Sequence, residues 1–125
     1  MPGTYSQILL HIVFGTKHRQ RWITPEIADR LYPYMGGIVR VEGGILYNIG
    51  GIEDHVHLYL RWRPDEGMSG LMRTVKARSS KWVHETFPTL GEFAWQEGYS
   101  VFFVSKSQED AVKKYIAGQL EHHKK

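Results

Sequence analysis

Two histidines separated by one residue are the first chemical feature of the sequence. His55 and His57 open the segment His55 to Trp62, in which apolar residues occupy every second position. On an extended strand, residues i and i+2 share a face and lie about 7 Å apart. Both imidazoles can therefore converge on one cation, although two ligands are too few and a third must come from elsewhere. The alternative is a pair of half-exposed strand histidines that bind nothing.

A tyrosine and a glutamine four residues apart near the end of the chain form the second feature. Tyr115 and Gln119 would lie on one helical face, beside an apolar stripe formed by Val112, Ile116 and Leu120. A phenol can attack phosphorus and form a phosphotyrosine that conserves the energy of the cut phosphodiester bond. A metal ion would polarise the same phosphate and stabilise its developing charge. The alternative is that Tyr115 only packs against neighbouring apolar side chains.

Other polar and aromatic residues near these motifs have two interpretations each. Asp54 precedes the first histidine and either accepts a hydrogen bond from an imidazole or ends a turn. We interpret His11 as structural, with a position facing the site as the alternative. Trp95 and Tyr99 are interpreted as core or interface residues in preference to platforms for nucleic-acid bases.

Periodicity and turn signals predict the elements that must position these residues. The helix from Pro25 starts after the capping residue Thr24, and Pro33 and the glycine pair that follows weaken the prediction for its second half. The order strand, helix, strand, strand, helix, strand, helix predicts an α+β fold. The predicted fold is an antiparallel sheet of the ferredoxin-like or RNA-recognition-motif-like kind, with helices on one face and an additional C-terminal catalytic helix. The predicted elements are a strand over Tyr5–Phe14, a helix from Pro25 to near Val41, strands over Ile45–Ile49 and His55–Trp62, a helix from Met68 to before Pro88, a strand or strand pair over Phe93–Ser105, and a helix from about Gln108 to Glu121.

Composition limits the classes of protein to which the chain can belong. Its 125 residues, 42% of them hydrophobic, predict a single domain over residues 1–125. The net charge of +3 permits a polyanionic partner without requiring one. The absence of cysteine excludes disulfides and thiolate metal sites. Because no apolar stretch could span a membrane and no signal peptide is recognisable, we expect a cytoplasmic protein without a membrane partner.

Basic residues occur in two groups that could neutralise DNA phosphates. One lies in the loop after the first strand and the other on the outer face of the second helix. Each group could equally be an ordinary solvated surface. The candidates are Lys17, Arg19 and Arg21 in the loop, and Arg73, Lys76, Arg78 and Lys81 on the helix.

Taken together, these motifs resemble those of the single-tyrosine HUH transposases, the insertion-sequence-200-like group that includes repeat-associated tyrosine transposases. The resemblance combines a His-hydrophobic-His strand with Tyr-x-x-x-Gln on the last helix, and it covers nearly the whole chain. The segments that carry it are Leu10–Lys17, Gly51–Leu58, Ala94–Tyr99, Phe103–Ser105 and Tyr115–His123.

The resemblance implies a specific reaction and a specific set of partners. His55, His57 and Gln119 would bind Mg²⁺ or Mn²⁺, and Tyr115 would cleave single-stranded DNA through a 5′-phosphotyrosine at hairpin-flanked element ends. Asp54 would support the metal site. Family members are homodimers in which one subunit supplies the catalytic helix to the other in trans. A transposase of this kind would act in a bacterial or archaeal cell, associated with the nucleoid when it is bound to DNA.

Three other functions fit part of the pattern. A replication or relaxase-type HUH nicking enzyme shares the histidine pair and the tyrosine, but its motif order usually differs. A non-catalytic module that binds single-stranded nucleic acid on the same fold leaves the pairing of Tyr115 with Gln119 unexplained. A small histidine-based metallohydrolase would need a carboxylate general base at a motif-like distance from the histidines, and the sequence shows none.

Overall fold

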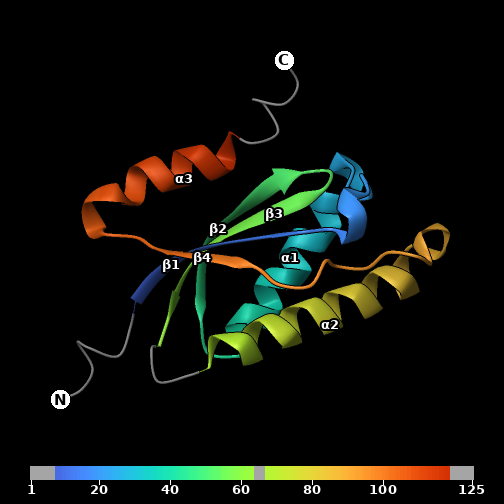
Figure 1. Ribbon diagram of the computed structural model, residues 1–125, viewed down its shortest axis with the longest axis horizontal. Coiled ribbons are helices and arrows are strands. Elements are labelled where there is room, and N and C mark those ends of the chain that lie inside the picture. Colours follow the sequence, from blue (N-terminus) through green and yellow to red (C-terminus); the bar gives the residue numbers. More distant parts are fainter. Residues whose placement is uncertain (1–7, 64–66, 119–125) are drawn as a thin grey trace.

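The computed structural model describes residues 8–63 and 67–118, which fold into one antiparallel sheet and three α-helices (Figure 1). The strand order is β2-β3-β1-β4. This confirms the α+β, ferredoxin-like architecture predicted from the order of elements. The elements are β1 (Ile8–Gly15), α1 (Pro25–Val41), β2 (Ile45–Ile52), β3 (His55–Trp62), α2 (Met68–Thr86), β4 (Ser100–Phe103) and α3 (Glu109–Ala117), with 3-10 turns at Lys17–Arg19, Pro88–Leu90 and Lys106–Gln108.

The main hydrophobic core lies between the sheet and the pair of helices α1 and α2, which cover one of its faces (Figure 1). Every second residue of β1 and β3 points into this core, as the alternation in the sequence predicts. Burial of these side chains drives the association of the two layers. The strand residues in the core include Leu10, Ile12 and Phe14 of β1 and Val56, Leu58, Leu60 and Trp62 of β3.

Helix α3 covers part of the opposite face of the sheet, over β2 and β3 (Figure 1). Tyr59, Val104 and Ile116 form a second, smaller core beneath it. The alternation in β3 correctly places Tyr59 on the face of the histidines, but the expected polar surface is wrong at this position, because the Tyr59 side chain is fully buried under α3. The two histidines precede Tyr59 on this same face of β3, His55 half-buried and His57 buried.

Two features of β2 allow α3 to dock closely. A β-bulge between Leu46 and Asn48 shifts the alternation, and the Asn48 side chain donates a hydrogen bond to the carbonyl of Lys113 on α3 at 3.0 Å. Gly50 lies directly under Ile116, where a Cβ atom would come within 2.5 Å of the Ile116 carbonyl oxygen. The absence of a side chain at Gly50 therefore sets how close α3 can approach the sheet.

Helix α1 runs the full predicted length from Pro25 to Val41, and Thr24 caps its first turn by accepting a hydrogen bond from the backbone of Ile27. Pro33 does not end the helix. The backbone hydrogen bond that a proline cannot donate would have gone to Asp29. Pro33 and Asp29 are both solvent-exposed, so water can replace that bond.

The segment before α3 differs from the prediction. The strand predicted over Phe93–Ser105 is largely wrong, because only Ser100–Phe103 pairs with β1, and Trp95 forms a single bridge to Thr16. Backbone hydrogen bonds join Ala94 to Lys17 and Gln96 to Gly15, and side chains of α2 also hold the segment. The indole of Trp95 donates to the hydroxyl of Ser79, and Phe93 is buried in the main core.

Among residues 8–63 and 67–118, no helix has the length and apolar character needed to cross a membrane.

Candidate functional site

His55 and His57 lie on β3, on the face opposite α1 and α2, with their ring centroids 5.0 Å apart. The strand places them there because Val56 and Leu58 alternate with them and are buried in the main core. The rings are inclined by 66°, so one edge of each imidazole approaches the other ring. The structure thus brings the predicted histidine pair together at one end of the sheet.

Asp54 holds the first histidine. Its carboxylate accepts a hydrogen bond from Nδ1 of His55 at 2.8 Å, and the guanidinium of Arg19 lies 3.3 Å from the same oxygen. Burial raises the pKa of Asp54, but the hydrogen bonds and charges of His55 and Arg19 outweigh burial and hold this pKa below its ordinary value. Asp54 is therefore a charged acceptor that fixes the orientation of the His55 ring. The structure favours the first of the two interpretations of this residue.

The second histidine is held by a residue that the sequence led us to interpret as structural. Nδ1 of His57 lies 2.8 Å from Nε2 of His11 on β1, and the two rings are stacked with centroids 5.1 Å apart. In the β1–β3 register His11 lies opposite Tyr59, so it reaches His57 diagonally across the strand pair. Burial lowers the pKa of His11, which favours its neutral form. His11 is thus part of the site, and only the strand register could have shown this.

Tyr115 lies against the second histidine. Its ring centroid is 5.4 Å from that of His57 and 6.2 Å from that of His11, with an edge-to-face arrangement in both cases. The side chain is 56% exposed, so the phenol remains accessible to a large substrate. A single chain therefore brings the predicted nucleophile to the predicted histidine pair. Gln119, the third ligand implied by the resemblance, lies outside the described residues.

A polar cleft of about 310 Å³ opens over these groups. One wall comes from β1 and β3, and the other comes from the segment before β4 together with α3. The cleft contains both imidazoles, a guanidinium and the phenol, a combination suited to a phosphate group. Its lining includes Arg19, His55, His57, Gln96, Tyr99 and Tyr115.

The described side chains offer part of a metal site. Nδ1 of His55 is engaged by Asp54 and Nδ1 of His57 is engaged by His11, so Nε2 is the atom through which each ring would bind a cation. Neutral imidazole with a second-sphere partner is a common metal ligand. No group of three or more His, Cys, Asp or Glu side chains within residues 8–63 and 67–118 is arranged to hold a metal. The pair fits a metal that takes its remaining ligands from elsewhere, as the expected contribution of Gln119 requires.

Among the predicted DNA-contacting residues of the first loop, Arg19 lies at the histidines, whereas Lys17 and Arg21 are exposed on the surface. His18 and Arg19 both adopt positive φ angles, 55° and 54°. Such backbone conformations cost side-chain-bearing residues free energy and are concentrated at functional sites. The strained turn directs Arg19 back toward Asp54.

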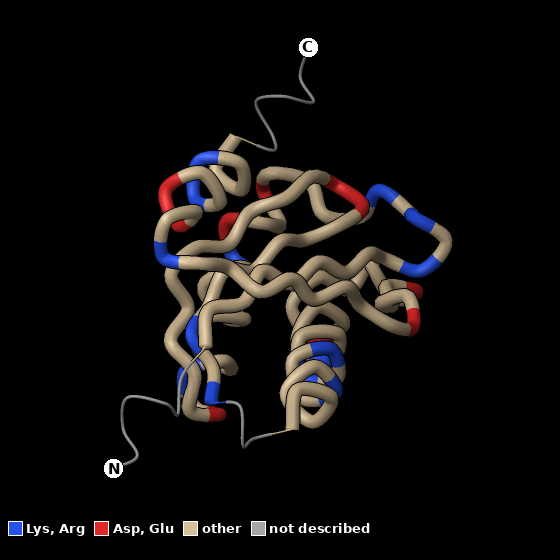
Figure 2. The backbone as a smooth tube through the Cα atoms, turned by 60° about the vertical axis from the view of Figure 1, so that its left-hand side comes forward, with Lys and Arg blue, Asp and Glu red and all other residues tan. Residues whose placement is uncertain are grey.

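The basic residues of α2 form a group separate from that of the first loop (Figure 2). Arg73, Arg78 and Lys81 are exposed, and Lys81 lies 4.0 Å from Glu85. Lys76 differs, because its ammonium group donates to the carbonyls of Gln96 at 2.8 Å and Gly98 at 2.6 Å. Its main contacts therefore hold the segment before β4, and a phosphate would have to compete with two carbonyl oxygens.

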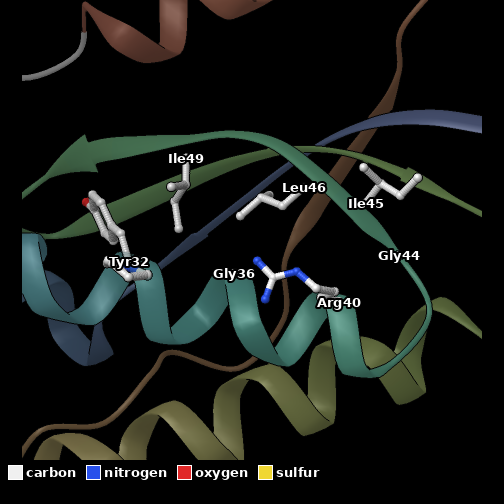
Figure 3. Close-up of a pocket in the computed structure, with 8 residues that line it drawn as sticks. Tyr32, Gly36, Arg40, Gly44, Ile45, Leu46 and Ile49 are labelled. Atoms are coloured by element: carbon white, nitrogen blue, oxygen red, sulfur yellow. The ribbon is translucent and has the colours of Figure 1, made fainter.

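A cavity of about 510 Å³ lies between α1 and β2, on the side of the sheet that faces the helices (Figure 3). Tyr32, Gly36 and Arg40 of α1 face Leu46 and Ile49 of β2 across it. The histidines lie on the opposite face of the sheet, so this cavity is not part of the site.

Comparison with known proteins identifies similar sequences over nearly the whole chain. A family model described as "Transposase IS200 like" matches residues 4–119. The ISDra2 transposase TnpA of Deinococcus radiodurans is 25% identical over 122 residues, which cover 94% of this chain and 87% of that protein. The transposase for insertion sequence element IS200 of Salmonella typhimurium is 28% identical over 120 residues, or 91% of this chain and 78% of that protein.

Two solved structures share the fold. The crystal structure of a candidate transposase from Deinococcus radiodurans R1 superposes with a TM-score of 0.77 and 26% identity, covering 95% of each chain. The structure of a REP-associated tyrosine transposase bound to a REP hairpin superposes with a TM-score of 0.72 over 94% of this chain and 69% of that chain. At 13% identity, the second comparison supports the fold alone.

Proposed function

The chain belongs to the IS200-like transposase family, and from this premise we propose that it cuts and rejoins single-stranded DNA with Tyr115 as the nucleophile. The observation that carries the proposal is the contact between Tyr115 and His57, which places an exposed phenol beside one of the two histidines that we propose as metal ligands. A tyrosine that served only to pack would be expected to lie inside the small core under α3 with Ile116, not at its edge.

The proposed cleavage is a transfer of the phosphate from one oxygen to another. The hydroxyl of Tyr115 loses its proton and forms a bond to phosphorus, while the bond from phosphorus to the 3′ oxygen breaks. The 3′ oxygen takes up a proton and leaves as a hydroxyl, and the 5′ phosphate stays on Tyr115. Rejoining reverses the step, because a 3′-hydroxyl attacks the phosphotyrosine and releases the phenol. Neither step needs a nucleotide cofactor.

His55 and His57 would hold Mg²⁺ or Mn²⁺ together with Gln119, with Asp54 and His11 fixing the two rings. When bound, the metal would withdraw charge from the phosphate oxygens as bonds to phosphorus form and break. Arg19 would add a second positive charge at the edge of the cleft.

We propose that single-stranded DNA with hairpins is the substrate, by analogy with the REP-associated tyrosine transposase, a fold relative whose structure is that of a complex with a REP hairpin. Lys17 and Arg21 on the first loop, with Arg73, Arg78 and Lys81 on α2, would bind its phosphates. Replacing one such cation, as in Arg78→Ala, should weaken DNA binding at all sequences and reduce the slope of log K against log salt by about 0.7–0.9. Binding titrations over a salt series measure both effects.

The test of the proposed function is the formation of a covalent adduct. Wild type and Tyr115→Phe are incubated with hairpin single strands from the flanks of the gene that are labelled at their 3′ ends, with Mg²⁺ or Mn²⁺, and separated under denaturing conditions. We expect a labelled adduct that requires metal and is absent from the variant, while Mn²⁺ binding is retained. Tight hairpin binding by wild type with no adduct on any flanking strand would instead support a non-catalytic binding module.

We also propose a homodimer in which α3 is exchanged between subunits, as the family resemblance implies. A mixture of His57→Ala and Tyr115→Phe chains tests the exchange. If α3 acts in trans, heterodimers contain one site with both functional residues, and cleavage returns in the mixture. If α3 acts on its own sheet, where it lies in the single chain, every site lacks one residue and the mixture stays inactive.

A further inference from the structure

The contact between His11 and His57 requires the two imidazole rings to have complementary protonation at the facing nitrogens. Two ring nitrogens 2.8 Å apart can form a hydrogen bond only if one of them carries a proton and the other presents a lone pair. At that separation they share a proton, since two nitrogens that bind one cation at about 2.1 Å would lie farther apart. Either Nδ1 of His57 donates to Nε2 of His11, or the reverse.

The two arrangements have opposite effects on the histidine pair. If Nδ1 of His57 donates, the neutral ring has its second lone pair on Nε2, the atom that can bind a metal. If Nε2 of His11 donates, Nδ1 of His57 is the acceptor and Nε2 of His57 carries the proton, which excludes it as a ligand. The direction of this one hydrogen bond therefore decides whether His57 can bind a cation.

We propose that His11 is a positioning residue that accepts the Nδ1 proton of His57 and so leaves Nε2 of His57 to bind the metal. This inference rests on the metal-binding role proposed above for His57. For the second ring of the pair, His11 does what the Asp54 carboxylate does for His55. A partner of this kind fixes the tautomer and the ring orientation of a metal-bound histidine.

The surroundings of His11 hold it in place for this role. The β1–β3 ladder fixes its backbone, and its ring is stacked on that of His57 with an angle of 25° between the planes. The aromatic rings of Phe102 on β4 and Tyr115 on α3 lie 5.7 and 6.2 Å from it. With aromatic neighbours on β4 and α3, the imidazole has little freedom to turn away from His57.

Long-range ¹⁵N–¹H spectra of the metal-free protein measure the tautomer directly. In wild type, at a pH where the rings are neutral, we expect the proton of His57 on Nδ1. In His11→Leu the acceptor is gone, and protonation of Nε2 should appear. His11→Gln retains an amide oxygen that can accept, so it should restore the wild-type tautomer. A proton on Nε2 of His57 in the wild-type spectrum would overturn the proposal.

Binding of Mn²⁺, followed by electron paramagnetic resonance or calorimetry, gives a second readout independent of cleavage. We expect His11→Leu to bind about 10–100-fold more weakly than wild type and His11→Gln to bind nearly as well. The matched control is His84→Leu, which loses a hydrogen bond of 2.7 Å to the carbonyl of Phe93, outside the site, and should bind as wild type does. Equal affinity in wild type and His11→Leu would refute the role. If His11→Leu fails to fold, the spectrum and affinity of His11→Gln still test it.

Failure of this inference and failure of the proposed function give different results. An adduct on Tyr115, together with unchanged Mn²⁺ affinity in His11→Leu, would remove the role of His11 and leave the cleavage reaction standing. The expected tautomer and affinities, without an adduct on any strand, would support a metal site positioned by His11 in a protein that does not cleave DNA.

Discussion

Replacement of Gly50 by alanine should slow DNA cleavage without touching any side chain of the site. The new Cβ would lie 2.5 Å from the carbonyl oxygen of Ile116, about 0.9 Å short of ordinary contact at 3.4 Å. Helix α3 must therefore recede from β2 by close to 1 Å, and Tyr115, the residue before Ile116, recedes with it. A misplacement of that size can reduce a reaction rate about 10²-fold. Overpacking of this kind also costs roughly 1–3 kcal/mol of stability.

Single-turnover cleavage of a labelled hairpin strand measures the rate of Gly50→Ala, and urea unfolding measures its stability. The matched control is Gly37→Ala on α1, where a Cβ meets no atom within 4 Å and the helix should become slightly more stable. The same displacement is expected whether α3 belongs to the same chain or to a partner, since the contact is between a helix and β2. A folded Gly50→Ala that cleaves at the wild-type rate would refute the argument that this glycine positions the nucleophile.

Three further predictions concern groups around the site. Asp54→Asn replaces the charged acceptor of His55, so calorimetry should show Mn²⁺ binding weakened about 10–100-fold, and unchanged affinity would contradict the role of the carboxylate. Lys76→Met removes two hydrogen bonds to backbone carbonyls and should lower the free energy of unfolding by about 1–3 kcal/mol, as measured by urea titration. If the variant instead loses DNA affinity with no loss of stability, Lys76 is a phosphate ligand. The hydroxyl of Tyr59 and nearby lysines lower the pKa of Glu109 below 4.5, so its contribution to stability is present above pH 4.5 and is lost as the pH falls through the lower folded value. Wild type should therefore lose stability in acid more steeply than Glu109→Gln, and parallel acid profiles would argue against a stabilising role of the ionised Glu109 carboxylate.

Local signals in the sequence predicted most of the elements. The Thr24-Pro25 cap and the alternation from His55 to Trp62 each depend on neighbouring residues only, and the structure confirms both boundaries. The effect of Pro33 on the helix could not be judged from the sequence, because it depends on whether water can reach the carbonyl left without a partner. The segment from Phe93 to Tyr99 was mispredicted as strand because several of its contacts are with Ser79 and Lys76, which lie on a helix and not on a strand.

The site could be predicted only where a single segment carries it. The spacing of His55 and His57 can be recognised in the sequence, and so can the spacing of Tyr115 and Gln119. Of the second pair, the structure describes Tyr115. The role of His11 depends on how β1 aligns with β3, and a shift of one residue would point its ring into the main core. The register between β1 and β3 could not be predicted from the sequence alone.

The two histidines are equivalent by spacing but differ in their partners. His55 donates to a carboxylate, and the pKa of that carboxylate is held low, so its partner carries a full negative charge. His57 is hydrogen-bonded to an imidazole, whose neutral form burial favours. A charged acceptor makes an imidazole a more basic ligand than a neutral acceptor does, so we expect His55 to bind a cation more strongly than His57. Tyr115 packs against His57, so the proposed nucleophile lies beside the histidine that we expect to bind the metal less strongly.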